Sequence, residues 1–336
     1  MRVALAYDQA SRVRLGDPGE VVSAEWSLGQ VEQVERALGR LGHEPVRLPL
    51  EQDLAAFLRA AERCPAALVF NLVQSNHCSH VARLLERLGR RYTGSGPLAI
   101  DLTTDKALSK DVLRAHGVPV PAYRAVHRVG EWRDHGLAYP LIVKPLEVDN
   151  SLGIGPDSIV AGEAALARQT ERVLAAYGAA VLEEFVDGRE LLVSLQGNGP
   201  EPEALPICEA GFDRFPPGMA RIYDFASKWE QPGSGAALID WAARADLAPA
   251  AESAVLDACR QACRVLGCRD YARVDLRLDR DSVPRVLEVN TNPDVHPRAG
   301  YGASALESGR TFEQLVADLI AIALAAPADE RAQEHM

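Results

Sequence analysis

The stretch DYARVDLRLDRDSVPRVLEVNTN at residues 270–292 is the most informative part of the chain, because two apolar runs flank a polar turn. This pattern predicts an antiparallel hairpin. Side chains two residues apart lie on the same face of a strand, so Arg273 shares a face with Asp275, and Glu288 with Asn290. Charged and polar groups therefore line one face of a largely apolar hairpin.

A turn symmetric about residues 281–282 places Asp275 directly opposite Glu288, where the Cβ atoms of antiparallel strands are only about 4.5–5.5 Å apart. Two carboxylates at that distance repel each other unless a cation lies between them. Together with the amide oxygen of Asn290, they suit Mg²⁺ that also holds phosphate groups. The hairpin alone is equally compatible with a solvated face on which Arg273 neutralises the acids.

The N-terminal part of the chain alternates apolar runs of strand length with amphipathic segments. The expected strands are 2–7, 45–50 and 66–73, and the expected helices are 27–41 and 51–62. Strands that alternate with helices predict a parallel sheet over about the first 95 residues.

The remaining elements follow from periodicity and from turn residues. The expected helices are 105–117, capped by Thr104, and segments near 162–176, 247–266 and 311–325. The expected strands before the hairpin are 139–148, 179–186 and 189–197. Residues 211–240 are polar with little periodicity, which is typical of an active-site loop, and 327–336 are expected to fray.

Lysine is rare in this chain: only four of the 36 basic residues are lysine. The lysines that remain are enriched at sites that need a compact ammonium group. Lys144 ends an apolar strand and precedes a loop with Gly153 and Gly155, whose backbone amides could hold phosphate oxygens. The spacing matches neither the P-loop nor the dinucleotide-binding fingerprint, so an ordinary turn is the simpler interpretation of this loop alone.

Two further groups of residues could take part in binding. Glu183 and Glu190 flank a predicted turn and could accept hydrogen bonds from a ribose or an adenine amino group, although solvated strand ends are the simpler interpretation. His77 and His80 flank Cys78, but this spacing fits no standard zinc ligand set. A structural or substrate-facing role is favoured for both histidines.

Composition limits the class of protein. The 336 residues allow two or three domains, and at 47% hydrophobic and 25% charged they can bury sizeable cores. The net charge of −11 argues against nucleic acid or an anionic membrane as a general partner. No apolar run reaches the roughly 18–20 residues of a membrane span, and the first residues lack a signal-peptide pattern. The six cysteines form no CxxC pair, which predicts reduced thiols and a cytoplasmic enzyme.

Taken in order, these segments resemble the ATP-grasp enzymes and, among them, the D-alanine–D-alanine ligases. The matching motifs are YTGSG (92–96), TDKALSK (104–110), VPVP (118–121), YPLIVKPLEVDNSLGIG (139–155), VLEEFVDGREL (181–191), YDFASKW (223–229), ARVDLRL (272–278) and LEVNTNP (287–293). The resemblance runs from about residue 90 to the C-terminus and is looser over 1–90. Each motif alone is weak, but their order and spacing are specific.

The resemblance implies an α/β fold with α+β parts in a three-domain ATP-grasp architecture. Residues 1–95 would form an N-terminal α/β substrate domain, 96–180 a central lobe, and 181–330 a C-terminal lobe with the metal site. ATP would be clamped between the two lobes. The implied activity is an ADP-forming ligase that joins a carboxylate, expected to be an amino acid, to an amine through an acyl phosphate. An ATP-grasp phosphotransferase and a non-catalytic nucleotide-binding protein remain open.

The resemblance also assigns roles to individual residues. Lysines at 106, 144 and 228 would contact ATP phosphates, and Glu183 and Glu190 would hold adenine and ribose. The full set implied for ATP is Lys106, Lys144, Ser151, Gly153, Glu183, Glu184, Val186, Glu190, Lys228 and Leu287. Asp275, Glu288 and Asn290 would bind two Mg²⁺ ions, for which Mn²⁺ could substitute. Arg273 would stabilise the tetrahedral intermediate, Lys228 would assist catalysis, and Glu25 would hold the ammonium group of the first amino acid.

These assignments carry expectations for two lysines. Lys144 is expected to be an exposed cleft residue that can be replaced by alanine without loss of the fold. Lys110 has no assigned role, and its replacement by alanine is expected to be nearly silent.

The sequence departs from the ligases where they bind amino acids. QSNHCSH at 74–80 replaces the family's HGxxGEDG, Trp229 replaces a loop tyrosine, and Asn150 replaces a loop serine. After Asn290 the chain continues PDVHPRAGY, without the glycine and serine-containing run that holds the second substrate's carboxylate. D-alanyl-D-alanine is therefore not the expected product. The substrate candidates are Asp294, His296, Arg298, His77 and His80, with the alternative that Asp294 only caps the following turn.

The expected partners are a small-molecule carboxylate and an amine, with neither nucleic acid nor a membrane. The identity of the two substrates stays open, and so does a homodimeric state.

Overall fold

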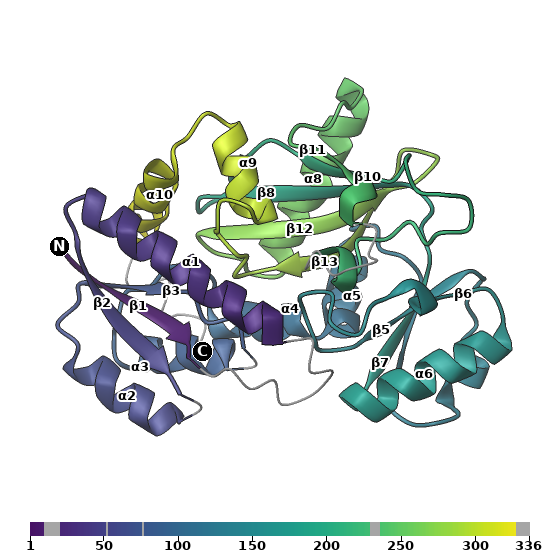
Figure 1. The fold of residues 1–336 in the computed structure, drawn as a ribbon, viewed down its shortest axis with the longest axis horizontal. Coiled ribbons are helices and arrows are strands. Elements are labelled where there is room, and N and C mark those ends of the chain that lie inside the picture. Colours follow the sequence, from purple (N-terminus) through teal and green to yellow (C-terminus); the bar gives the residue numbers. More distant parts are fainter. Residues whose placement is uncertain (10–20, 52, 76, 229–235, 327–336) are drawn as a thin grey trace.

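The computed structural model describes residues 1–9, 21–51, 53–75, 77–228 and 236–326, and over 21–27 and at 237 it describes the backbone alone. Its strands form three sheets, each covered by helices (Figure 1). In that view the N-terminal sheet lies at the left, the C-terminal sheet at the top and the central sheet at the lower right. The expected α/β fold with α+β parts is confirmed.

The N-terminal sheet consists of β1 (Arg2–Asp8), β2 (Glu44–Leu50) and β3 (Leu68–Asn71) in the order β2-β1-β3, and all its pairs are parallel, as predicted. Alternate side chains of β1 enter different cores. Val3 and Leu5 pack with the helices α1 (Val21–Arg40) and α10 (Phe312–Ala325). Ala4 and Ala6 pack with the helices of the opposite face, which are α2 (Leu54–Arg63), α3 (Cys78–Arg87) and α4 (Pro97–Thr104).

The central sheet has the order β4-β7-β5-β6, and its strands pair antiparallel. The strands are β4 (Tyr123–Val126), β5 (Leu141–Pro145), β6 (Ile159–Val160) and β7 (Ala180–Glu184). Leu141 and Val143 of β5 pack against α6 (Glu163–Tyr177), which covers one face of this sheet. Alternation therefore turns Ile142 and Lys144 to the opposite face. Because β7 pairs with both β4 and β5, the central sheet extends to Glu184, past residue 180.

The C-terminal sheet has the order β11-β10-β8-β12-β13, with β9 paired to β8. The strands are β8 (Arg189–Gln196), β9 (Glu203–Ala204), β10 (Cys208–Gly211), β11 (Asp240–Ala242), β12 (Tyr271–Leu278) and β13 (Pro284–Asn290). Val193 and Val274 belong to the core under α8 (Pro249–Val265). Residues offset by one position in these strands, such as Arg273, Asp275 and Arg277, lie on the other face.

The β12–β13 hairpin pairs as predicted: Arg273 lies opposite Asn290, and Asp275 opposite Glu288. The expected turn symmetry is wrong. Leu278 lies opposite Pro284, which centres the turn on residue 281. A β-bulge then leaves Leu287 as an extra residue in β13 and restores the predicted register beyond it.

The helix predicted at 105–117 is α5 (Lys106–Ala115), and its cap is Asp105 rather than Thr104. The Asp105 carboxylate accepts hydrogen bonds from the backbone N–H groups of Ala107 and Leu108, at 2.9 Å each. Thr104 instead ends α4, where its hydroxyl donates to the Ile100 carbonyl at 2.8 Å. Helix α4 was not predicted from the sequence, because its apolar residues follow a glycine-rich turn.

Other differences concern short elements. Three short helices were not predicted from the sequence: α9 (Gly300–Glu307), η2 (Glu131–Asp134) and η3 (Pro156–Ser158). The polar stretch 211–240 contains α7 (Phe225–Lys228), η4 (Ala236–Leu238) and part of β11. Trp229 and the expected frayed end at 327–336 lie outside the described residues.

Within the described residues, no helix combines the length and the apolar character that crossing a bilayer requires. The six cysteines carry free thiols.

Candidate active site

A cavity of about 960 Å³ is lined by side chains from all three parts of the fold. The N-terminal part contributes Gln74, Ser75 and His80, and the central sheet contributes Ile142, Lys144 and Glu183. The C-terminal part contributes the polar face of its sheet, which includes Glu190, Arg273, Asp275, Arg277, Glu288 and Asn290. The predicted hairpin face is thus directed into a cavity and not toward bulk solvent.

Arg273 and Asp275 form a two-pronged ion pair within this face. The Nε atom of Arg273 donates to Asp275 Oδ1 at 2.6 Å, and Nη2 donates to Oδ2 at 2.8 Å. Burial alone would lower the pKa of Arg273, but the Asp275 carboxylate raises it, so the guanidinium stays charged. Part of the alternative interpretation therefore holds, because Arg273 does neutralise one of the two acids.

Glu288, opposite Asp275, lies among cationic side chains. Burial alone would raise its pKa, but the charges of Lys106, Lys144 and Arg273 lower it. For Asp275 the balance is reversed, since burial and the nearby charge of Glu288 raise its pKa despite Arg273. The pKa values of the two acids are thus shifted in opposite directions, as expected for carboxylates that face each other.

Lys144 and Lys110 share one buried carboxylate. Lys144 Nζ donates to Glu183 Oε2 at 2.7 Å, and Lys110 Nζ lies 2.8 Å from Oε1. Burial alone would raise the pKa of Glu183, but the two ammonium groups lower it to about 2. The expectation that Lys144 is exposed is wrong, since the residue is 7% exposed. Lys110 is fully buried, which argues against the prediction that its replacement is silent.

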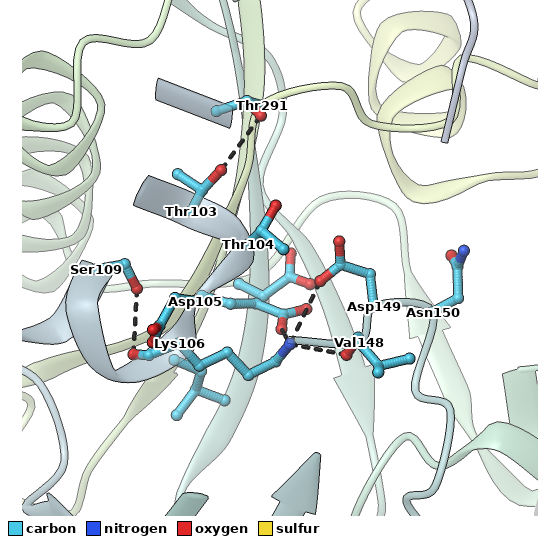
Figure 2. Close-up of polar contacts among 12 residues, drawn as sticks. Thr103, Thr104, Asp105, Lys106, Ser109, Val148, Asp149, Asn150 and Thr291 are labelled. Carbon is cyan, nitrogen blue, oxygen red and sulfur yellow. Dashed lines mark hydrogen bonds and ion pairs between the residues drawn. The ribbon is translucent and has the colours of Figure 1, made fainter. Parts of the chain in front are cut away.

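Lys106, at the start of α5, reaches the loop that follows β5 (Figure 2). Its Nζ donates to the Val148 carbonyl at 2.8 Å and to Asp149 Oδ1 at 3.3 Å, and it lies 3.9 Å from Glu288 Oε2. Figure 2 shows the ammonium group between this loop and the neighbouring carboxylates. Burial would lower the pKa of Lys106, but Asp149 and Glu288 raise it.

The loop 149–155 contacts the segment that carries Lys228. Lys228 Nζ donates to Asn150 Oδ1 at 3.2 Å, and the Ser151 hydroxyl donates to the Tyr223 carbonyl at 3.3 Å. Gly153 has a φ of +74°, and an added Cβ would lie 2.7 Å from atoms of Pro145 and Tyr177. The position therefore requires glycine. Burial and the charge of Arg273 lower the pKa of Lys228.

The lining of the cavity also includes four apolar residues and two acids, which are Ile142, Phe185, Val186, Leu287, Glu184 and Glu190. Glu190 pairs with Arg277, whose Nη2 donates to Glu190 Oε2 at 2.6 Å and whose Nη1 donates to the Val186 carbonyl at 2.9 Å. Glu184 accepts a hydrogen bond from the backbone of Ala138 at 2.8 Å. These residues combine apolar walls with carboxylate and carbonyl acceptors.

Only some of the predicted substrate residues line the cavity. Asp294 and Arg298 line the cavity, whereas His296 does not. Asp294 also accepts a hydrogen bond from the His296 backbone at 2.7 Å, so it both caps the turn and faces the cavity. His80 lines the cavity, and the ring of His77 packs edge-on against it with the centroids 5.9 Å apart. Burial lowers the pKa of His296.

Glu25 lies in α1 where the structure describes the backbone alone, and Trp229 lies outside the described residues.

The donor set fits Mg²⁺ in part. Asp275 and Glu288 are cross-strand partners that both line the cavity, and the amide of Asn290 lies on the same side. Over the described ranges, no three His, Cys, Asp or Glu side chains are grouped as a metal site. Two carboxylates and an amide oxygen are few ligands, which suits a cation that takes its remaining oxygens from water and phosphate.

Four further residues of this site were not predicted from the sequence: Asp149, Arg277, Tyr223 and Trp241. Arg277 continues the alternation of Arg273 and Asp275, so strand periodicity could have identified it. The Tyr223 and Trp241 rings meet edge-on with centroids 4.8 Å apart and both line the cavity. No local pattern identifies this pair, because the two rings are brought together only by folding.

Comparison with known proteins places this geometry in a family. The family profile described as D-ala D-ala ligase C-terminus matches residues 112–321. The chain is 33% identical to an uncharacterised protein, y4sG, of Sinorhizobium fredii (strain NBRC 101917 / NGR234), over 96% of this chain and 97% of that protein. It is 32% identical to a D-alanine–D-alanine ligase of Synechococcus sp. (strain JA-3-3Ab), over 91% of each.

The fold is also similar to a solved structure. The D-alanine–D-alanine ligase of Bacillus anthracis, in a crystal structure complexed with ATP, aligns with a TM-score of 0.77. The alignment covers 99% of each chain at 22% sequence identity. On the profile match, the similarity to its relatives and the cavity described above, this chain belongs to the D-alanine–D-alanine ligase family of ATP-grasp proteins.

Proposed function

We propose that this protein is an ATP-dependent, ADP-forming ligase that joins a carboxylate to an amine through an acyl phosphate. The observation that carries the proposal is the arrangement around Glu288. Its carboxylate faces Asp275 across the hairpin and lies among the charges of Lys106, Lys144, Arg273 and Lys228. Alternating acids and cations in one cavity suit a divalent metal with a triphosphate.

The nucleotide would lie between the central and C-terminal sheets. The ATP complex of the Bacillus anthracis ligase supports this proposal, since the folds agree over 99% of the chain. Ile142, Phe185, Val186 and Leu287 offer apolar walls for the base, and Glu190 offers an acceptor for the ribose. Lys106, Lys144 and Lys228, with the backbone at Ser151 and Gly153, would hold the phosphates.

Asp275, Glu288 and Asn290 would hold Mg²⁺, or Mn²⁺ in its place. When bound, the metal would neutralise charge on the phosphate oxygens. Both carboxylate oxygens of Asp275 accept hydrogen bonds from Arg273, at 2.6 and 2.8 Å. Arg273 therefore fixes the orientation of the Asp275 carboxylate.

In the first step the substrate carboxylate attacks the γ-phosphorus of ATP, and ADP leaves. In the second, the amine attacks the acyl carbon, the phosphate leaves with the carbon–oxygen bond electrons, and the amine loses a proton. Arg273, 8% exposed and directed into the cavity, would stabilise the oxyanion of the tetrahedral species. The segment around Lys228 would keep water from the acyl phosphate.

The acceptor is proposed not to be D-alanine. Asp294 faces the cavity four residues beyond Asn290, where an acceptor carboxylate would be repelled. Two like charges about 4 Å apart cost on the order of 4 kcal/mol at an effective dielectric constant near 20. That corresponds to roughly a thousandfold in affinity. An acceptor with an amine or a hydroxyl group toward Asp294 fits better. The rings of Tyr223 and Trp241 add apolar surface to the same cavity.

Phosphate release in the presence of ATP and Mg²⁺ tests this proposal. D-alanine as sole substrate is compared with larger amino acids, polyamines and hydroxy-amines. Release that requires a carboxylate and an added amine supports the ligase. ADP formation without an amine and without phosphate release would indicate a phosphotransferase, whose product keeps the phosphoryl group. No ADP formation with any substrate pool would indicate a nucleotide-binding protein. Robust turnover on D-alanine alone would contradict the proposed specificity.

A further inference from the structure

Lys110 is a buried cation that the proposed chemistry does not use. Its side chain, on α5, is fully buried and is absent from the lining of the cavity. Its Nζ lies 2.8 Å from Glu183 Oε1 and donates to the Leu287 carbonyl at 2.7 Å. Glu183 belongs to the central sheet, and Leu287 is the bulge residue of β13. One ammonium group therefore connects α5 to both sheets that flank the cavity.

Burying this ammonium group carries a cost. Desolvation lowers the pKa of Lys110, although Glu183 opposes that shift. Buried ion pairs are often no more stabilising than apolar side chains of similar volume. A contribution to stability alone is thus a weak explanation for a lysine at this position.

The geometry offers a better explanation, because Lys110 and Lys144 share Glu183. Lys144 lines the cavity, and its Nζ lies 2.7 Å from Glu183 Oε2. If Lys144 were the only partner, an anionic ligand that drew its ammonium group away would leave a buried carboxylate uncompensated. Breaking a buried pair in this way is strongly unfavourable. Lys110 removes the conflict, since Glu183 keeps one cation when Lys144 turns to the ligand.

We propose that Lys110 is a positioning residue: it balances the buried charge of Glu183 so that Lys144 can present its ammonium group to the nucleotide phosphates. The inference rests on the proposed binding of ATP. It assigns the Glu183 carboxylate to the two lysines, rather than to the adenine or ribose that the family resemblance suggested.

The test measures ATP affinity in the presence of Mg²⁺ by calorimetry for the wild type and three variants. Lys110→Met leaves Lys144 as the only partner of Glu183, so affinity should fall about tenfold or more, equivalent to about 1.4 kcal/mol. Lys110→Met combined with Glu183→Gln removes the competing negative charge, so affinity should return to near the wild-type value. Arg114→Met removes an exposed cation from the same helix and should leave affinity unchanged.

A purely structural role for Lys110 would lower the thermal midpoint and leave the ATP affinity of the folded protein unchanged, which would overturn the inference. Failure of the double variant to recover affinity would also overturn it, because Glu183 would then contact the nucleotide itself. Lys110→Gln, with and without Glu183→Gln, repeats the comparison if the methionine variant does not fold. A wild type that binds no ATP would overturn the proposed function and this inference together, whereas equal binding by wild type and Lys110→Met would overturn the inference alone.

Discussion

The carboxylate of Glu288 lies among four cationic side chains. Lys106, Lys144, Arg273 and Lys228 all lower its pKa, against the effect of burial. Its cross-strand partner Asp275 is already paired with Arg273. These charges keep the Glu288 carboxylate ionised, which is the form that the proposed binding of Mg²⁺ requires.

Replacement Glu288→Gln removes this charge but little volume. The fold should survive, and Mg²⁺-dependent ADP formation should fall about a hundredfold or more, the scale of losing one preorganised charged group. Coupled measurement of ADP checks the rate. Asp281→Asn, at the exposed turn of the same hairpin, is the matched control and should retain activity. Near-normal turnover of Glu288→Gln would show that this face of the hairpin is structural.

At the scale of elements, the junction between α4 and α5 positions Lys106 and Lys110. Asp105 separates the two helices and caps α5 through the backbone N–H groups of Ala107 and Leu108. Thr104, the cap expected from sequence, hydrogen-bonds within α4 instead. The cap sets the start of the helix and hence the direction in which both lysines leave it.

The two residues can be compared by mutation. Asp105→Ala should destabilise the protein by about 1 kcal/mol, the usual contribution of an N-cap. In thermal denaturation this corresponds to a shift on the order of 2 °C for a chain of this size. Thr104→Ala should cost less, because alanine gains helix propensity as the hydroxyl bond is lost. A larger loss for Thr104→Ala than for Asp105→Ala would contradict the assignment of the cap.

At the scale of the whole molecule, Glu183 links parts that are distant in sequence. Its carboxylate holds Lys144 of β5 and Lys110 of α5, and Lys110 in turn holds the Leu287 carbonyl of β13. The central and C-terminal sheets are thus joined through one buried charge. Protonating Glu183 should weaken the connection between them.

The pH dependence follows from the sign of the shift. The pKa of Glu183 in the folded protein is about 2, below its ordinary value of 4.5. The stabilisation is therefore complete above about pH 5 and is lost as the pH falls through 4.5 toward 2. Over the full range the loss is on the order of 3 kcal/mol. Thermal midpoints measured from pH 6 to pH 3 should fall more steeply for the wild type than for Lys110→Met/Glu183→Gln, and parallel curves would contradict this.

Much of the site was predictable because it depends on local alternation. The shared faces of Arg273 with Asp275 and of Glu288 with Asn290 follow from the two-residue period of a strand. The parallel N-terminal sheet follows from alternating strands and helices, and the motif order indicates the family. The pairing of Asp275 with Glu288 was also predicted, although the bulge at Leu287 and not a symmetric turn produces it.

By itself, the sequence determined which residues carry charge, which strand faces are polar and which family the chain resembles. Only the tertiary structure decided the partners of those charges. Lys110, Lys144 and Glu183 lie on three different elements, and neither periodicity nor spacing relates them. Buried charges take whichever partner the packing of the core brings within hydrogen-bonding distance, because an unpaired charge there is too costly. Lys110 was expected from the sequence to be dispensable. Because packing between distant segments places it beside Glu183 and Leu287, it connects the central and C-terminal sheets instead.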